Sequence, residues 1–266
     1  MIRLIGIDVD GTLVGTDGTV HPSVWPAAKR ACAAGIHLAL CSGRPAFGIA
    51  LEYARRLDPV GWHVFQNGAS IVCLADEQSR SVTLPADAVA ALIAVARRTA
   101  DVLELYSDND YVTESTSAWA KDHAALLGVP FHARVFESLS GAVVRAQWLL
   151  SPQDAERITA SDYPELEIAE STSPVMSDTT FVGLTRAGVS KGAAIRAIAA
   201  EYGVAMQDIM YIGDSGNDLS ALRVVGCPIA MANADPEVRE LAKRTVGHVD
   251  DGGVAQALEL ALSGTV

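Results

Sequence analysis

The first thirteen residues restrict the possible folds of this chain more than any other stretch does. An apolar run from Ile2 to Ile7 stops at Asp8-Val9-Asp10-Gly11-Thr12-Leu13. A buried strand that ends in such a polar turn is typical of an open α/β sheet, which binds ligands at the carboxyl ends of its strands. The two neighbouring carboxylates would repel each other unless a cation, a proton or hydrogen-bond donors compensated them. A surface turn rich in Asp and Gly would explain the same residues.

The order of the expected elements indicates two domains. Strands and helices alternate up to about residue 60, and this alternation resumes at Gly188. From about Pro85 to Phe181 the order becomes helix, strand, strand, as in an α+β domain. We therefore expect an α/β fold: a Rossmann-like doubly wound parallel sheet made of residues 1–84 and 182–266, with an α+β domain inserted at residues 85–181. Within the first part, residues 70–84 are consistent with a hairpin whose turn is Asp76-Glu77-Gln78-Ser79-Arg80.

Polar loops follow several of these strands. Ser42-Gly43-Arg44 follows an expected strand at residues 36–40, and Gly213-Asp214-Ser215-Gly216-Asn217-Asp218 follows one at residues 208–212. A hydroxyl, a glycine amide and a guanidinium would suit a phosphate, although a helix cap explains Ser-Gly-Arg equally well. Asn67-Gly68 is first of all a tight-turn signal. Lys191 begins an Ala-rich helix and, taken alone, reads as a solvated surface lysine.

Composition excludes several classes of protein. Of 266 residues, 50% are hydrophobic and 20% are charged, so the chain is globular rather than disordered. The net charge of -12 argues against a nucleic-acid partner, because phosphate backbones bind basic surfaces. No stretch approaches the roughly 18 apolar residues of a membrane span, and the start of the chain is unlike a signal peptide. We expect a cytoplasmic protein with no membrane partner; the sequence does not indicate its oligomeric state.

The cysteines and histidines do not suggest a metal site. No Cys-x-x-Cys pair and no His-x-x-x-His spacing occurs, so we expect no zinc site. We interpret the cysteines as reduced, partly buried thiols: Cys32, Cys41, Cys73 and Cys227.

The ordered set of loops resembles a known family. A pair of aspartates, Ser-Gly-Arg, an isolated lysine in Gly188-Val189-Ser190-Lys191-Gly192 and the acidic Gly-Asp-x-x-Asn-Asp motif stand in that order along the chain. In arrangement and spacing they resemble the haloacid dehalogenase superfamily, and more closely its Cof-type (subclass IIB) sugar-phosphate phosphatases. The likeness covers essentially the whole chain, because the insertion is placed and sized like the α/β (C2-type) cap of that subgroup.

The resemblance implies a phosphatase that uses Mg2+. Asp8 would be the nucleophile that forms an aspartyl-phosphate, and Asp10 would be the general acid and base. The metal would be held by the carboxylates of Asp8 and Asp214 and by the main-chain carbonyl of Asp10. The phosphoryl oxygens would be held by the following groups: the amides of Val9 and Gly43, and the side chains of Ser42, Lys191 and Asn217.

Other residues would support this site. Asp218 would orient Lys191 or a metal-bound water. Arg44 would bind substrate or fix its loop, and Asn67 is a further candidate for a supporting role. Cys41 stands where many relatives have another small residue, and we expect only packing consequences.

The substrate class expected from the resemblance is a small phosphomonoester, most plausibly a sugar phosphate. A phosphomutase built on the same nucleophile is one alternative, and it would need a bisphosphate activator. A regulatory module that binds phosphorylated metabolites without turnover is another. The joint presence of Asp8, Asp10, Lys191 and Asp214 argues against a pure binder, which has no use for an acid beside a nucleophile. The sequence does not name the substrate.

Overall fold

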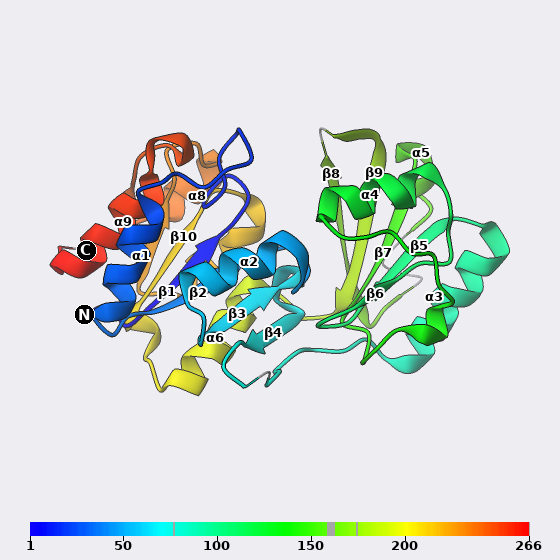
Figure 1. The fold of residues 1–266 in the computed structure, drawn as a ribbon, viewed down its shortest axis with the longest axis horizontal. Coiled ribbons are helices and arrows are strands. Elements are labelled where there is room, and N and C mark those ends of the chain that lie inside the picture. The colour runs from blue at the N-terminus through cyan, green and yellow to red at the C-terminus, as the bar shows by residue number, and fades with distance from the viewer. Residues whose placement is uncertain (77, 159–162, 174, 266) are drawn as a thin grey trace. The chain divides into compact units, whose positions relative to one another are not determined.

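The computed structural model describes residues 1–76, 78–158, 163–173 and 175–265. These residues form two compact units (Figure 1). Unit 1 consists of Met1–Gly43, Ala50–Arg80 and Ser190–Val266, and unit 2 consists of Arg44–Ile49 and Ser81–Val189. The domain limits expected from the sequence, with residues 85–181 as the inserted domain, stay a prediction.

Unit 1 is built on a seven-stranded sheet in the order β12-β11-β10-β1-β2-β3-β4. Neighbouring strands are parallel except β3 and β4, which are antiparallel. All residues of β1 are buried, as expected for a parallel strand covered on both faces. The strands are β1 (Leu4–Asp8), β2 (His37–Cys41), β3 (Trp62–Phe65), β4 (Ser70–Cys73), β10 (Ile209–Gly213), β11 (Cys227–Ala230) and β12 (Arg244–Thr245).

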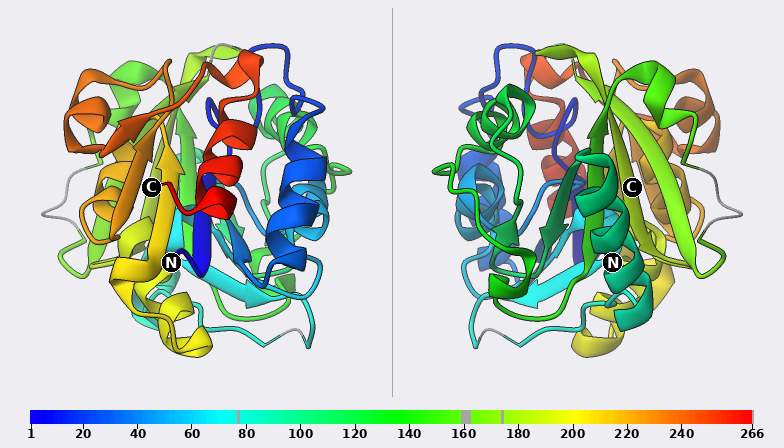
Figure 2. Two further views of the ribbon diagram at one scale, coloured as in Figure 1. Left: turned by 90° about the vertical axis from the view of Figure 1, so that its left-hand side faces the viewer. Right: turned by 90° about the vertical axis from the view of Figure 1, so that its right-hand side faces the viewer.

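Helices cover both faces of this sheet (Figure 2, left view). On one face, α1 packs along α9, and Trp25 of α1 stacks on Tyr53 of α2 with ring centroids 6.4 Å apart. On the other face, α7 packs against both α6 and α8. The helices are α1 (Val24–Ala33), α2 (Gly48–Leu57), α6 (Lys191–Tyr202), α7 (Leu219–Leu222), α8 (Pro236–Leu241) and α9 (Gly253–Ser263), with single 3-10 turns at Gln66–Gly68, Met206–Asp208, Gly216–Asp218 and Val249–Asp251.

The order in which the chain adds strands to this sheet reverses between β1 and β10, although the two strands are parallel. From β1 the chain continues to β2 on one side, and from β10 it continues to β11 on the other side. Such a switch point opens a crevice at the carboxyl ends of the strands, which is where open α/β sheets bind ligands. The expected doubly wound parallel sheet is confirmed, and its switch point lies at Asp8 and Gly213.

Unit 2 is built on a five-stranded antiparallel sheet in the order β6-β5-β7-β9-β8. An apolar core that includes Leu92 of α3 and Trp148 of β7 forms on one face, and a smaller cluster that includes Ala120 of α4 forms with Leu149 and Phe181. The elements are α3 (Ala86–Thr99), β5 (Val102–Tyr106), β6 (Tyr111–Val112), α4 (Ala118–Leu127), a 3-10 turn at Phe136–Ser138, β7 (Arg145–Leu150), α5 (Pro152–Ala155), β8 (Leu166–Ser173) and β9 (Met176–Arg186).

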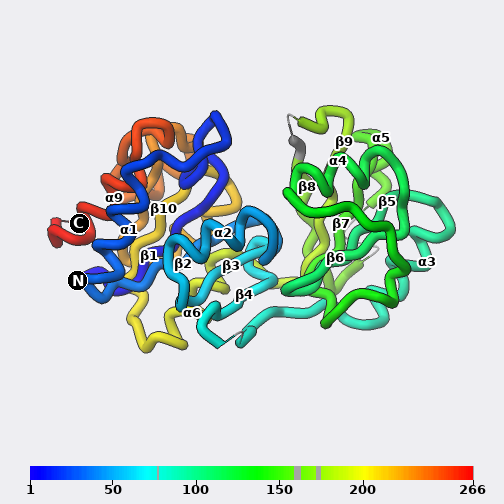
Figure 3. The backbone as a smooth tube through the Cα atoms, in the orientation of Figure 1, coloured from blue at the N-terminus to red at the C-terminus, as the bar shows by residue number. Residues whose placement is uncertain are grey.

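The chain passes between the units at four points, and the two connections near residues 80 and 190 can be followed along the tube in Figure 3. It leaves unit 1 after Gly43 and returns at Ala50, then leaves again after Arg80 and returns at Ser190. The antiparallel sheet in the second excursion confirms the expected insertion of an α+β segment into a parallel core. Within the described residues, no helix has the length and apolar character that crossing a bilayer requires.

Two local details differ from the expectations. The expected hairpin at residues 70–84 is present only near its start: β4 pairs with β3 on one side, and on its other side Val72 makes an isolated antiparallel bridge with Ser79. The amide of Cys73 donates to the carbonyl of Gln78 at 2.8 Å and the amide of Arg80 to the carbonyl of Ile71 at 2.9 Å, so Gln78, Ser79 and Arg80 belong to the returning segment and not to the expected turn. The long strand β9 was not expected, because Gly183 and the Ser/Thr-rich start of the strand resemble a loop. The cysteines are free thiols, as expected, and all but Cys32 are buried.

Candidate active site

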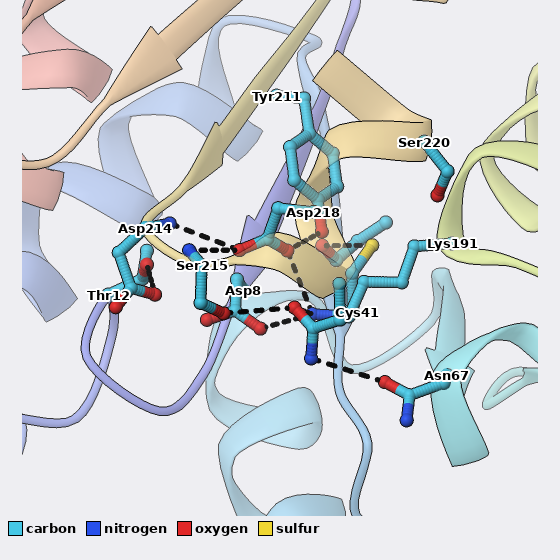
Figure 4. Close-up of polar contacts among 12 residues, drawn as sticks. Asp8, Thr12, Cys41, Asn67, Lys191, Tyr211, Asp214, Ser215, Asp218 and Ser220 are labelled. Carbon is cyan, nitrogen blue, oxygen red and sulfur yellow. Dashed lines mark hydrogen bonds and ion pairs between the residues drawn. The ribbon is translucent and has the colours of Figure 1, made fainter. Parts of the chain in front are cut away.

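Asp8 is the last residue of β1 and is only 4% exposed. Its Oδ1 atom accepts a hydrogen bond from Nζ of Lys191 at 2.5 Å (Figure 4). Its Oδ2 atom is buried and has no hydrogen-bond donor. A buried carboxylate oxygen without a donor is costly, so this atom is suited to a ligand that the chain itself does not supply.

The turn after Asp8 brings a second carboxylate to the same place. Gly11 has a φ of 84°, and a Cβ atom there would lie 2.3 Å from Oδ2 of Asp214. Only glycine therefore allows the turn and Asp214 to approach so closely. Thr12 donates to Oδ1 of Asp214 at 3.0 Å, and three amides after the aspartate pair bond to the carbonyl of Val9. The carboxylates at the ends of β1 and β10 are thus held together by a tight turn.

Lys191 is the first residue of α6 and is only 1% exposed. Its ammonium group donates to Asp8, to Oδ1 of Asp218 at 2.8 Å and to Oδ1 of Asn217 at 3.0 Å. Burial alone would lower the pKa of Lys191, but the charges of Asp8 and Asp218 outweigh burial and raise it, so the lysine is a cation. The interpretation of an isolated, solvated lysine is wrong. The sequence did not show that three acceptors meet at this helix start.

Asp218 organises the loop after β10. It is fully buried, and both of its oxygens are occupied: Oδ1 accepts from Lys191 and from the hydroxyl of Tyr211 at 2.7 Å. Oδ2 accepts from the amides of Asp214 and Ser215 at 3.0 and 3.2 Å. These four contacts fix the direction of the Lys191 side chain and the path of the loop that carries Asp214.

Tyr211 was not expected as part of the site. Its side chain is buried in β10 opposite Gly6 of β1, and a Cβ atom at Gly6 would lie 2.6 Å from the Tyr211 ring. Gly6 therefore makes room for the ring whose hydroxyl reaches Asp218. No sequence signal separates such a tyrosine from an ordinary core residue of a buried strand.

Three carboxylates gather around a single cation. Oxygen atoms of Asp8, Asp214 and Asp218 lie within 4.8 Å of one another. Burial, followed by the charge of Asp218, raises the pKa of Asp8 well above its usual value and that of Asp214 to about 6. Lys191 supplies one positive charge for three carboxyl groups, so the cluster is short of positive charge. A hard divalent cation with oxygen ligands fits this set, and it would be held by Oδ2 of Asp8 and by Asp214, since the oxygens of Asp218 are occupied.

Asp10 lies on the exposed side of the same turn. It follows Val9, which is buried, and it makes a bridge with Val14. The structure thus places the second aspartate of the pair beside Asp8 in the chain but in a solvent-exposed position. Its expected roles, as acid and base and as a carbonyl ligand, stay predictions.

The loop after β2 is joined to the same cluster. Ser42 is fully buried, and its carbonyl accepts from the amide of Asn67 at 2.9 Å. Asn67 has a left-handed φ of 54°, and its Oδ1 accepts from Asn217 at 3.4 Å. A Cβ atom on Gly43 would lie 3.1 Å from the Asn67 side chain. The helix-cap interpretation of Ser-Gly-Arg is wrong, because α2 begins only at Gly48.

The structure therefore brings most of the expected residues into one cluster of unit 1. Asp8, Asp214, Asp218, Lys191 and Asn217 are linked through hydrogen bonds or shared oxygen contacts, and Asn67 joins Ser42 to Asn217. Arg44 belongs to unit 2, and its expected role stays a prediction.

Comparison with known proteins gives a consistent result. A family model described as haloacid dehalogenase-like hydrolase matches residues 5–258. YxeH of Bacillus subtilis (strain 168) is 28% identical over 271 aligned positions, which cover 99% of this chain and 100% of YxeH. The 5-amino-6-(5-phospho-D-ribitylamino)uracil phosphatase YwtE from the same strain is 26% identical over 288 positions, which cover 99% of each chain.

A solved structure shows the same fold. The haloacid dehalogenase subclass IIB sugar phosphatase BT4131 superposes with a TM-score of 0.79 at 22% identity, covering 99% of this chain and 100% of that one. At this identity the likeness shows the shared fold alone. The chain therefore belongs to the haloacid dehalogenase-like hydrolases, and it is a phosphatase of that family with the Cof-type, subclass IIB fold.

Proposed function

We propose that this protein is a Mg2+-dependent phosphatase that hydrolyses a small phosphorylated metabolite, a sugar or polyol phosphate, through an aspartyl-phosphate on Asp8. One observation carries the proposal. The buried carboxylate of Asp8 is bonded on one oxygen by Lys191, while its other oxygen has no donor. A nucleophile beside a fixed cation and an open ligand position is what transfer of an anionic phosphoryl group requires.

The proposed reaction has two displacements. In the first, a carboxylate oxygen of Asp8 attacks phosphorus, the bond to the leaving alcohol breaks, and Asp10 gives its proton to the departing oxygen. In the second, Asp10 takes a proton from water, the water oxygen attacks phosphorus, and inorganic phosphate leaves as the Asp8 carboxylate is restored. The exposed position of Asp10 supports this assignment, because an acid that also activates water needs access to solvent.

The phosphoryl oxygens would be held by groups around Asp8. Lys191 supplies a fixed positive charge whose direction is set by Asp218. Asn217 contacts the same ammonium group, so its amide lies within reach of a group bound there. The buried loop at Ser42 and Gly43 would supply a hydroxyl and an amide, and Val9 a further amide. Donors fixed before the reaction stabilise the charge that spreads over the phosphoryl oxygens.

Mg2+ suits the position beside Oδ2 of Asp8 and the Asp214 carboxylate better than a softer metal does. The ligands offered by Asp8 and Asp214 are carboxylate oxygens, to which the carbonyl of Asp10 would be added, and Mg2+ prefers oxygen. A bound Mg2+ would offset the carboxylate charge and so allow an anionic substrate to approach an anionic nucleophile.

The names of two similar proteins bear on which alcohol the proposed substrate carries. YwtE is named for a ribityl phosphate and BT4131 for sugar phosphates, so both names describe a phosphate on a hydroxylated carbon chain. Such a likeness supports, for this chain, a leaving alcohol with several hydroxyl groups. We propose that residues 85–181 recognise this alcohol, since a site for phosphate alone accepts almost any phosphomonoester.

The test is the release of inorganic phosphate from a panel of phosphomonoesters, with Mg2+ and with EDTA. The panel would contain sugar phosphates, ribitol 5-phosphate, pyridoxal phosphate and p-nitrophenyl phosphate. We expect Mg2+-dependent release and a preference for the hydroxylated substrates. Release that is unaffected by EDTA would contradict the metal proposal, and transfer of phosphate to a second sugar in place of release would favour the phosphomutase.

A further inference from the structure

Unit 2 contains buried polar side chains that the proposed reaction at Asp8 does not use. The pairing of β5 with β7 places Glu104 opposite Gln147 and Tyr106 opposite Arg145, and β6 places Tyr111 opposite Tyr106. Directly opposed residues project from the same face of a sheet. These five side chains therefore share one face, which we call the polar sheet face.

The polar sheet face contrasts with the reverse side of the same strands. There, Leu103, Leu105 and Trp148 belong to the larger apolar core of unit 2. An antiparallel sheet with one apolar face usually exposes its other face to water. Here, however, Glu104 is fully buried and Tyr106 is only 1% exposed. Burial of a carboxyl group on the polar face is costly unless its oxygens find partners.

Within the polar sheet face, two buried polar atoms have no hydrogen-bond partner. Oε2 of Glu104 accepts a hydrogen bond from the hydroxyl of Tyr106, and Nδ1 of His123 lies 2.8 Å from the same oxygen. Oε1 of Glu104 is buried and has no partner, and the same holds for the hydroxyl of Tyr111. Each buried polar atom without a partner costs about 1–3 kcal/mol. Two such atoms on one face indicate that something outside the chain satisfies them.

Aromatic rings lie beside these two atoms. Tyr106 and Tyr111 stack with centroids 5.9 Å apart, and Phe47 stacks on Tyr111 at 5.9 Å and on Tyr106 at 6.4 Å. The guanidinium of Arg145 lies 6.0 Å from the Tyr106 ring, and it passes close over Gly183, where a Cβ atom would be 3.0 Å from Nη2. Ring faces, a carboxylate and a guanidinium together are suited to a ligand that has both C–H surface and hydroxyl groups.

The chemistry of the two unpartnered atoms narrows the ligand further. An ionised carboxylate only accepts hydrogen bonds, whereas a tyrosine hydroxyl also donates. A ligand hydroxyl group satisfies both, because it can donate to Oε1 of Glu104 and accept from Tyr111. A second phosphate or a carboxylate would be repelled by Glu104. The face therefore suits a neutral, hydroxylated group.

We propose that Glu104 and Tyr111 are specificity-determining residues that bind a hydroxyl group on the alcohol part of the substrate. This proposal rests on the proposed phosphatase function, in which that alcohol is the leaving group.

Tyr111→Phe is the sharpest test, because it removes a hydroxyl that makes no hydrogen bond within the chain. The variant should be as stable as the wild type or slightly more stable. For the best sugar or polyol phosphate of the panel, kcat/KM should fall about tenfold, which corresponds to about 1.4 kcal/mol. For p-nitrophenyl phosphate, which has no aliphatic hydroxyl group, kcat/KM should change less than about twofold.

Two further variants complete the design. Glu104→Gln should show the same selective loss, because the amide has one acceptor oxygen where the carboxylate has two, one for Tyr106 and His123 and one for the ligand. Glu137→Gln is the matched control: this carboxylate is also in unit 2 but is exposed and paired with Arg97, so neither substrate should be affected. Melting temperatures of all variants would separate a folding defect from a loss of recognition.

The outcomes are distinguishable. If the wild type hydrolyses sugar phosphates and Tyr111→Phe does so equally well, the proposal for this face is wrong and a trapped water is the partner of both atoms. Equal losses on sugar and aryl phosphates would overturn it as well. A wild type that releases phosphate from no member of the panel would overturn the proposed function, and this proposal with it.

Discussion

The carboxylate of Asp218 holds the ammonium group of Lys191 at 2.8 Å, and both side chains are fully buried. Without the charge of Asp218, Lys191 would keep Asp8 as its partner, but the four donors that bond Asp218 would have to share fewer acceptor sites. Each buried donor left without a partner costs about 1–3 kcal/mol. The pair therefore ties stability and activity together, since Lys191 also bonds Asp8.

Asp218→Asn should lower the free energy of unfolding by about 3 kcal/mol, because it leaves buried donors without acceptors. The amide offers one acceptor oxygen where the carboxylate serves four donors. Urea denaturation measures the change. The control is Glu237→Gln, which breaks an exposed pair with Arg223 and should cost less than about 1 kcal/mol. Similar small losses in both variants would show that the buried pair does not contribute in this way.

Gly192→Ala should destabilise the protein, although alanine normally favours a helix. A Cβ atom at this position of α6 would lie 2.2 Å from the carbonyl oxygen of Ser220, so the two segments would have to move apart. Gly216→Ala serves as the control, because a Cβ atom there meets nothing within 4 Å. Thermal unfolding of both variants checks the prediction, and a Gly192→Ala protein as stable as its control would contradict it.

Asp10→Asn should reduce activity in a way that depends on the leaving group. A sugar alkoxide is a poor leaving group and needs a proton, whereas p-nitrophenolate leaves without one. The ratio of kcat for wild type and variant should therefore be much larger for a sugar phosphate than for p-nitrophenyl phosphate. Losses of the same size on both substrates would count against Asp10 as the acid.

Stabilisation by Mg2+ should depend on pH. In the metal-free protein, burial and then the charge of Asp218 raise the pKa of Asp214 to about 6. A carboxyl group with a raised folded-state pKa binds its proton more tightly when folded, so its contribution to stability falls as pH rises from about 4 to about 6. Mg2+ needs the ionised form, so it competes with the proton below about pH 6.

The melting temperature with and without Mg2+ measures this competition. We expect a clear increase at about pH 7.5 and a much smaller one at about pH 5. Asp214→Asn should show little increase at either pH. A shift of the same size at both values of pH would mean that Mg2+ binds elsewhere.

Short sequence signals were sufficient for the core and for much of the site. The apolar run before Asp8 and the glycine-rich turns mark where strands end, and strand ends meet at one edge of a parallel sheet. For this reason Asp8 and Asp214 could be placed together although 205 residues lie between them. Ser107-Asp108-Asn109-Asp110, a run of turn-forming residues between two apolar stretches, likewise favours the pairing of β5 with β6 that the structure shows.

Other features depend on contacts that the sequence does not show. β9 lies between β7 and β8, and its central place comes from pairing on both sides rather than from its own residues. The burial of Lys191 and the part of Tyr211 follow from how α6 and β10 pack on β1. A lysine in a first helical turn and a tyrosine in a strand occur in many settings, so the sequence does not indicate which contacts either residue makes.

The central claim is that Asp8 carries the phosphoryl group, and trapping that intermediate tests it most directly. Wild-type protein would be mixed with Mg2+ and its best substrate, quenched in acid within milliseconds, digested, and analysed by mass spectrometry. We predict a peptide that contains Asp8 and is heavier by one phosphoryl group, and the absence of this species in Asp8→Asn, which should also release no phosphate. A fully active wild type with no phosphorylated peptide, or an Asp8→Asn variant within about tenfold of wild-type activity, would contradict the account.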